Sequence, residues 1–303
     1  MKKLFLPLLM LVVTSWGELR AQSYAPFPYV QIPSYIADGA AADQWLAMNF
    51  WNNYPFDRAD EIFDPNTPKV AFLHYLDVLY ATDPVISAKA IEGLLGRAAA
   101  TEDGYWHILE VAETILYDPS SPARNDLLWE PFLRHAVGAK SPLDEASKVR
   151  YRTLLALVSR NQQGSLANDF VYTLPDGRQG RMHSIKSPYL LLYFYNPGCS
   201  ECARTKAQIE ASGLLEVLRS RGLLKVLAIH PDSDLSEWRK YLKENPEWWI
   251  SSYDKGEQIR SRDLYDLKAI PTIYLLDAQK TVLMKDPTVE DLLMVLDGIA
   301  RSK

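Results

Sequence analysis

The chain has 303 residues, a formal net charge of −5, 48% hydrophobic residues and 23% charged residues. This length is enough for two ordinary domains, since domains typically hold ~100 to 200 residues. The mildly acidic balance argues against nucleic acid as a partner, because nucleic-acid-binding surfaces are basic.

The amino terminus has the layout of a secretory signal peptide. Two lysines after Met1 precede an apolar core over residues 4–13, and small or polar residues follow over 14–21. The apolar stretch is far shorter than the ~20 residues that a transmembrane helix needs, so cleavage after Ala21 is favoured over a membrane anchor. Residues 1–21 therefore predict export, and the mature protein is expected in the periplasm or outside the cell.

Residues 22–161 predict a helical domain, in which amphipathic and aromatic-rich stretches are separated by Pro, Asp and Gly. The expected helices cover residues 41–52, 68–81, 84–99, 104–116, 123–137 and 143–160. Five aromatic residues cluster between positions 45 and 56, and we expect them to pack in the core because aromatic side chains bury large areas. These are Trp45, Phe50, Trp51, Tyr54 and Phe56. Nothing in this half indicates its role.

The polar stretch at residues 161–165 separates the helical pattern from a strand-rich one, so a second domain is predicted over 162–303. A β-hairpin is expected over 170–183, because Asp176-Gly177 tolerates the positive φ of a tight turn. Further predicted strands cover 190–195, 223–230, 249–253, 272–277 and 282–285, and predicted helices cover 199–219, 234–244, 256–265 and 289–301.

The order of these elements predicts a mixed sheet with helices on both faces. The strand–helix–strand unit over residues 190–230 predicts a parallel pair joined by a right-handed crossover. The short segment Ala278-Gln279-Lys280 joins the strands 272–277 and 282–285, which favours an antiparallel hairpin.

Cys199 and Cys202 are the only cysteines, and they lie where the 190–195 strand pattern gives way to the 199–219 helix pattern. The first sulfur is therefore expected at a helix start, where unpaired N–H groups stabilise the thiolate that attacks disulfides. Two intervening residues bring the second sulfur back within reach of the first. Cys199 is the predicted nucleophile and Cys202 the predicted resolving thiol.

A lone cysteine pair can have two other roles. An exported protein can use a lone pair as a structural clip. A zinc site is disfavoured because structural zinc needs four ligands and the chain has no second cysteine pair, so no metal is expected. Of the five histidines only His230 is expected at the same sheet edge as Cys199; it either tunes the thiolate or is an ordinary loop histidine.

Two segments resemble the active site and the cis-proline loop of the thioredoxin superfamily. They are residues 191–202, Leu-Leu-Tyr-Phe-Tyr-Asn-Pro-Gly-Cys-Ser-Glu-Cys, and residues 269–277, Ala-Ile-Pro-Thr-Ile-Tyr-Leu-Leu-Asp. The resemblance spans about 166–303, and the leading hairpin makes it most similar to the TlpA and ResA branch of exported thiol-disulfide oxidoreductases. The helical half resembles a domain of unknown function found ahead of such modules in secreted bacterial proteins.

The resemblance implies an α/β thioredoxin-like fold after a helical domain, with no bound cofactor. It implies protein thiols or disulfides as partners, and a redox partner protein that recycles the cysteine pair. It also implies that the Ile270–Pro271 bond is cis and faces the cysteines, with the backbone of Ile270 pairing with a partner peptide. The alternative is an ordinary trans proline at a strand start.

The sequence departs from the thioredoxin pattern at two positions. Many thioredoxins carry Trp just before the first cysteine and a buried acid six positions before it, where this chain has Gly198 and Tyr193. In thioredoxins that acid is usually assigned to proton transfer with the resolving thiol, and water or Glu201 could take over this role here. The Glu201 carboxylate also disfavours a thiolate beside it, which favours a reductase over a strong oxidant. A binding or scaffold protein that retains the module for structure remains the alternative.

Overall fold

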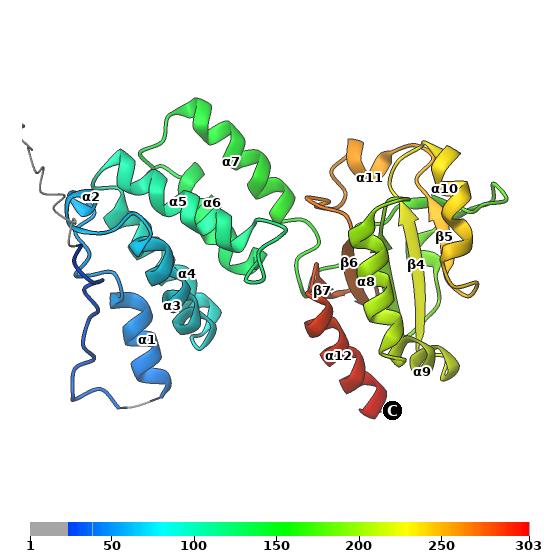
Figure 1. The fold of residues 1–303 in the computed structure, drawn as a ribbon, viewed down its shortest axis with the longest axis horizontal. Coiled ribbons are helices and arrows are strands. Elements are labelled where there is room, and N and C mark those ends of the chain that lie inside the picture. Colours follow the sequence, from blue (N-terminus) through cyan, green and yellow to red (C-terminus); the bar gives the residue numbers. More distant parts are fainter. Residues whose placement is uncertain (1–23, 38, 303) are drawn as a thin grey trace, which may run out of the picture.

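The computed structural model describes residues 24–37 and 39–302. The predicted signal peptide, residues 1–21, lies outside this range. A helical half and a sheet-containing half lie side by side, and the edge strand β7 (Val282–Lys285) is on the side of the sheet nearest the helices (Figure 1). Within the described residues, none of the helices is both long enough and apolar enough to cross a membrane.

All six predicted helices of the first half are present, with small shifts at their ends. The structure adds one short helix, α2. The helices are α1 Ala40–Asn49, α2 Ala59–Ile62, α3 Thr67–Tyr80, α4 Pro84–Ala98, α5 Glu102–Leu116, α6 Asp126–Val137 and α7 Glu145–Val158. Side-chain caps fix several starts: α6 begins at residue 126 and not at the expected 123, because the Asn125 side chain accepts the N–H of Leu128.

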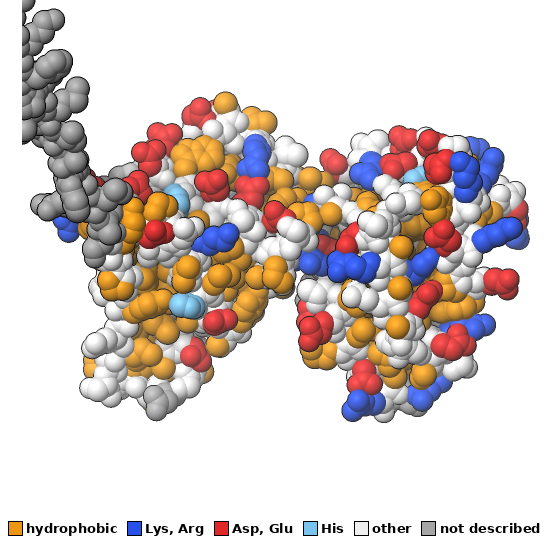
Figure 2. Space-filling view, in the orientation of Figure 1, with side chains coloured by type: hydrophobic (Ala, Val, Ile, Leu, Met, Phe, Trp, Pro, Cys, Tyr) orange, Lys and Arg blue, Asp and Glu red, His pale blue; other side chains and the backbone are white. Residues whose placement is uncertain are grey.

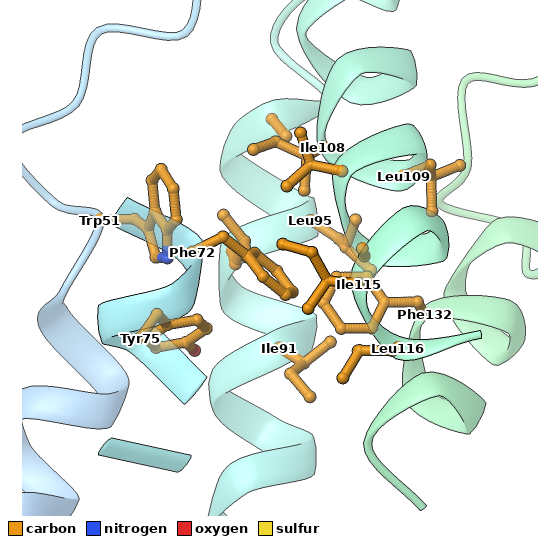
Figure 3. Close-up of a cluster of buried hydrophobic side chains, with 14 of the residues drawn as sticks. Trp51, Phe72, Tyr75, Ile91, Leu95, Ile108, Leu109, Ile115, Leu116 and Phe132 are labelled. Atoms are coloured by element: carbon orange, nitrogen blue, oxygen red, sulfur yellow. The ribbon is translucent and has the colours of Figure 1, made fainter. Parts of the chain in front are cut away.

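The core of this half is built from facing helices. Phe72 of α3, Leu95 of α4, Ile115 of α5 and Phe132 of α6 point toward one another (Figure 3). Four of the five clustered aromatic residues between positions 45 and 56 are buried, and Trp45 is half-buried. They pack edge to face in part, as Trp51 and Tyr54 do with ring centres 5.4 Å apart. The expected packing role of the cluster is confirmed.

The second half contains a seven-stranded sheet in the order β2-β1-β5-β4-β3-β6-β7. The other strands are β1 Val171–Thr173, β2 Gln179–Arg181, β3 Tyr189–Phe194, β4 Leu224–His230, β5 Ile250–Tyr253 and β6 Thr272–Asp277. The central strands β3, β4 and β5 are parallel, and the outer strands pair antiparallel. The predicted parallel pair, the final hairpin and the first hairpin, whose Gly177 has a φ of +87°, are confirmed.

Alternation along β3 places its side chains in two separate cores. Leu191 and Tyr193 pack with α8 (Ser200–Ala211), α9 (Leu214–Ser220), α10 (Leu235–Tyr241) and α12 (Val289–Ser302). Leu190, Leu192 and Phe194 pack on the opposite face with α11 (Gln258–Ser261) and with the segment after β2. The predicted class, a helical domain followed by a mixed sheet with helices on both faces, is confirmed.

Two expected helices differ from the structure. The single helix predicted over 199–219 is wrong: α8 ends at Ala211 and α9 begins at Leu214, because Gly213 adopts the left-handed region with a φ of +69°. The helix predicted over 256–265 is wrong in length, since α11 covers only Gln258–Ser261. Positive φ values at Glu257 and Asp263 bound this single turn.

The segment that follows α7 is tied to the sheet. The N–H of Gly164 bonds to the carbonyl of Val282, and the N–H of Ala167 bonds to that of Lys280. The last helix of the first half ends at Val158, and the first strand of the sheet starts at Val171. The division into domains 22–161 and 162–303 remains a prediction.

Candidate active site at the Cys199–Cys202 pair

Cys199 and Cys202 form a disulfide at the start of α8. A turn over residues 196–198 leads from the end of β3 to Cys199, which caps the helix. Its Sγ accepts the N–H of Cys202 at 3.0 Å. This contact uses one of the unpaired donors at the helix start, which is the environment that stabilises a thiolate after reduction.

The two cysteine residues differ in their access to solvent. Cys199 is half-buried, whereas the Cys202 residue is only 4% exposed. A pocket of about 220 Å³ opens onto both of them and is lined also by Tyr193, Lys206 and Glu244. This asymmetry suits an outer sulfur that meets a partner and an inner one that attacks the mixed disulfide.

The loop before β6 lies directly against Cys199. The Ile270–Pro271 bond is cis, as the resemblance implied, so the trans alternative is wrong. The carbonyl oxygen of Ile270 is 3.7 Å from the Cys199 Sγ. The pairing of Phe194 with Thr272 in the β3–β6 register brings the loop there, and the Thr272 hydroxyl closes it by donating to the Ala269 carbonyl at 2.5 Å.

The comparisons with known proteins agree with this geometry. Residues 187–282 match a family described as thioredoxin-like, and residues 13–161 match a domain of unknown function, DUF5106. The crystal structure of a thioredoxin-like protein from Bacteroides caccae is 35% identical, with a TM-score of 0.86 over 91% of this chain and 99% of that chain. The chain belongs to the thioredoxin-like family.

Two further solved structures each match less than half of this chain. The C-terminal domain of an uncharacterised protein from Bacteroides fragilis is 41% identical and covers 45% of this chain and 98% of that chain, with a TM-score of 0.44. A thiol:disulfide interchange protein from a Bacteroides species is 19% identical and covers 46% and 91%, with a TM-score of 0.41. No curated protein matches the chain.

A physical reason accounts for glycine before the first cysteine of this thioredoxin-like site. Gly198 has a φ of +70°, which side chains disfavour, and a Cβ there would lie 3.6 Å from the Tyr241 hydroxyl. The larger residue that many thioredoxins carry would thus meet both backbone strain and Tyr241.

Tyr193, at the position of the usual buried acid, acts as a hydrogen-bond donor. Its hydroxyl donates to the Cys202 carbonyl oxygen at 2.6 Å. Burial, followed by the influence of Tyr195, raises the pKa of Tyr193 well above its ordinary value. The phenol therefore keeps its proton at neutral pH and does not serve as a base for the Cys202 thiol.

Glu201, the carboxylate suggested as a substitute base, points elsewhere. Its side chain is exposed and pairs with Arg204 at 2.5 Å. It does not line the pocket at Cys202, so this suggestion lacks structural support. The pocket has Lys206 and Glu244 instead, which the sequence analysis missed; Lys206 lies one helical turn after Cys202, a spacing that could have indicated it.

His230 has a structural role in the loop after β4. Its Nε2 is 3.1 Å from the Asp234 carbonyl oxygen, and it is not among the residues that line the pocket at the disulfide. The structure thus fits the interpretation of His230 as an ordinary loop histidine. No group of three or more His, Cys, Asp or Glu residues suited to a metal ion occurs among residues 24–37 and 39–302.

Proposed function

We propose that this protein is an exported thiol-disulfide oxidoreductase that exchanges disulfides with protein partners and acts mainly as a reductase. One observation carries the proposal. The partly exposed Cys199 lies at the start of α8 and beside the cis-Pro271 loop, with the buried Cys202 disulfide-bonded to it. No bound cofactor is needed for this chemistry.

The exchange proceeds in two substitutions at sulfur. The reduced Cys199 thiolate attacks one sulfur of a partner disulfide, and the other partner sulfur leaves as a thiolate that takes up a proton. Cys202 then loses its proton and attacks the Cys199 sulfur, which releases the partner as a dithiol. The partner has gained two electrons and the Cys199–Cys202 pair has lost them, so a second redox protein must reduce the pair again.

The preference for reduction rests on the charge beside the nucleophile. Glu201 lies in the first turn of α8, where its carboxylate disfavours a thiolate on Cys199 and so makes the dithiol form less favourable. Arg204 offsets part of this effect through its ion pair with Glu201. A less stable dithiol is a better donor of electrons to partners.

Trapping with single-cysteine variants tests the assigned roles. Cys202→Ser should hold partners on Cys199 as mixed disulfides, and Cys199→Ser should not. The wild-type protein should also reduce insulin disulfides in the presence of dithiothreitol. If the pair cannot be cycled by dithiothreitol under native conditions, the protein is a scaffold or binding protein whose thioredoxin-like half is structural.

Export is tested separately from the chemistry. The layout of residues 1–21 supports cleavage after Ala21. Mass spectrometry of the protein recovered from its native host should find a mature amino terminus at Gln22, in the periplasm or the medium. An intact amino terminus in the cytoplasm would contradict export and leave the exchange chemistry untouched.

A further inference from the structure

A second hollow, of about 580 Å³, lies on the cis-proline side of the active site. Its walls come from both halves of the protein: the α5–α6 loop of the helical half, the outer face of α8, the cis-proline loop and the segment after β7. Pro119, Ser120 and Arg124 are the contributions of the helical half. The helical half therefore borders a hollow that is also lined by Ile270, whose carbonyl oxygen lies beside Cys199.

Ion pairs tie this loop to the thioredoxin-like half. The Arg124 Nε is 3.3 Å from an Asp286 carboxylate oxygen, and another guanidinium nitrogen donates to the Pro287 carbonyl at 3.2 Å. Both side chains are less than one-fifth exposed. Figure 2 shows acidic and basic side chains meeting where the two halves approach each other.

A more deeply buried cluster lies next to this contact. The Asp126 carboxylate forms ion pairs with the ammonium groups of Lys268 at 2.9 Å and Lys285 at 2.8 Å, and all three side chains are at most 10% exposed. The Lys268 ammonium also lies 4.7 Å from the centre of the Tyr117 ring. Because Lys268 is two residues before Ile270, the cluster fixes the start of α6 and the α5–α6 loop relative to the cis-proline loop.

The relative placement of the two halves recurs in another protein. The similarity to the thioredoxin-like protein from Bacteroides caccae extends over 91% of the chain with a TM-score of 0.86, which requires both halves to superpose together. The arrangement of the two halves is thus retained in a protein that is 35% identical to this one.

The lining of the hollow indicates what it accepts. Its charged side chains are already paired, Arg124 with Asp286 and Arg204 with Glu201, so no net charge remains for a ligand. Apolar atoms of Pro119, Pro271 and other residues line the rest of it together with hydroxyl groups such as that of Ser120. Such a surface suits apolar contacts and hydrogen bonds to an uncharged peptide.

We propose that this hollow is the groove that binds the partner, and that the helical half forms one of its walls. The groove takes an uncharged, extended polypeptide segment next to the partner's cysteine. The inference rests on the proposed function, because it concerns the same exchange at Cys199. A small disulfide reaches Cys199 without touching the wall, whereas a peptide disulfide must lie along it.

The test uses two probes that react with the reduced Cys202→Ser protein. Each probe releases the same coloured thiolate, thionitrobenzoate, when Cys199 attacks it. One is an uncharged peptide of Ala, Gly, Ser and Thr whose central cysteine carries thionitrobenzoate; the other is dithiobis(nitrobenzoate). Cys199 attacks the peptide sulfur, thionitrobenzoate leaves, and the peptide remains on Cys199. Ser120→Trp narrows the groove, and Ala146→Trp at an exposed position of α7 is the matched control.

Ser120→Trp should slow the reaction with the peptide by about tenfold and change the reaction with dithiobis(nitrobenzoate) by less than about twofold. Ala146→Trp should leave both rates within about twofold of the parent. In the parent, peptides with lysine or glutamate flanking the cysteine should react more slowly than the uncharged one. Circular dichroism confirms that each variant is folded.

The failures can be told apart. If the folded Ser120→Trp protein reacts with the peptide at the parent rate, or is slowed equally with both probes, the helical wall is not part of the groove and the proposed function stands. A charged peptide that reacts fastest overturns the choice of an uncharged occupant. If the parent reacts with neither probe, the exchange activity itself is wrong, and the groove assignment falls with it.

Discussion

The hydroxyl of Tyr193 donates a hydrogen bond of 2.6 Å to the carbonyl oxygen of Cys202. The bond links the central strand β3 to the first turn of α8, directly behind the disulfide. Tyr193 is 1% exposed and occupies the place where many thioredoxins have a buried acid. At the position of that acid, the tyrosine of this chain thus holds the helix that carries both cysteines.

Tyr193→Phe should lower the free energy of unfolding by about 1 kcal/mol, because it removes the hydroxyl and leaves a buried carbonyl without this donor. Urea unfolding of the oxidised protein measures the change. Tyr35→Phe, at a position that is 84% exposed, should have no effect. Equal stability of the two variants would show that the Tyr193 hydrogen bond contributes nothing.

The Glu201–Arg204 pair should tune the redox potential in two opposite directions. Glu201→Gln removes a negative charge beside Cys199, which favours the thiolate and the dithiol form and raises the midpoint potential. Arg204→Met removes the compensating positive charge and lowers it. Both shifts should stay below about 30 mV, since the two side chains are exposed.

Equilibration with dithiothreitol or glutathione buffers gives these potentials. Glu237→Gln is the control, because Glu237 and Lys240 form a similarly spaced exposed pair on α10. Shifts of the same sign for Glu201→Gln and Arg204→Met would show that the charge of the pair does not set the potential.

Asp126→Asn should destabilise the protein by about 3 kcal/mol, because it leaves Lys268 and Lys285 buried without their shared carboxylate. Hydrogen exchange of the segment 266–271 should rise at the same time, since Lys268 anchors that segment to the helical half. Asp297→Asn breaks an exposed pair with Arg301 on α12 and should cost less than about 0.5 kcal/mol. Unchanged exchange over 266–271 would contradict the anchoring role.

Asp266 should make the stability depend on pH. Burial raises the pKa of this carboxyl above its ordinary value, and the nearby Lys268 only partly compensates. Between the unfolded pKa of about 3.9 and the raised folded pKa, the folded state binds more protons, so the contribution of Asp266 to stability falls as pH rises.

Asp266→Asn tests this directly, because the amide can still accept the weak hydrogen bond from Tyr117. The stability of the wild type minus that of the variant should decrease from about pH 4 towards pH 7. Urea unfolding at several pH values measures this difference. A difference that grows with pH would mean that the carboxylate is stabilised in the fold and not penalised.

Replacing glycine by alanine should have opposite effects on the free energy of unfolding at two positions. Gly213 has a φ of +69° between α8 and α9, so Gly213→Ala should destabilise the protein by about 1 kcal/mol through backbone strain. Gly298 lies inside α12, and Gly298→Ala should stabilise it by about 0.5 kcal/mol. A Cβ would meet nothing within 4 Å at either site, so urea unfolding reports the backbone effect alone.

Each difference between the expectations from the sequence and the structure has a physical explanation. The break at Gly213 interrupts a stretch whose apolar spacing continues through it, so periodicity joined α8 and α9 into one helix. Positive φ values at Glu257 and Asp263 shortened α11, and such conformations of non-glycine residues leave little trace in a sequence. The pocket residue Glu244 was missed because it comes from a different segment than the cysteines.

The sequence by itself determined the strands, most of the helices and the place of Cys199 and Cys202 at a strand–helix junction, and its resemblance to the thioredoxin superfamily implied the cis-proline loop. These features depend on periodicity, turn residues and short motifs, which act over a few neighbouring positions. Only the tertiary structure decided that Asp126 bonds to Lys268, which is 142 residues away, and that the α5–α6 loop and the cis-proline loop line one hollow. Charged residues such as these look like surface residues in the sequence until the packing of the two halves buries them, because desolvation depends on neighbours that are distant in the chain.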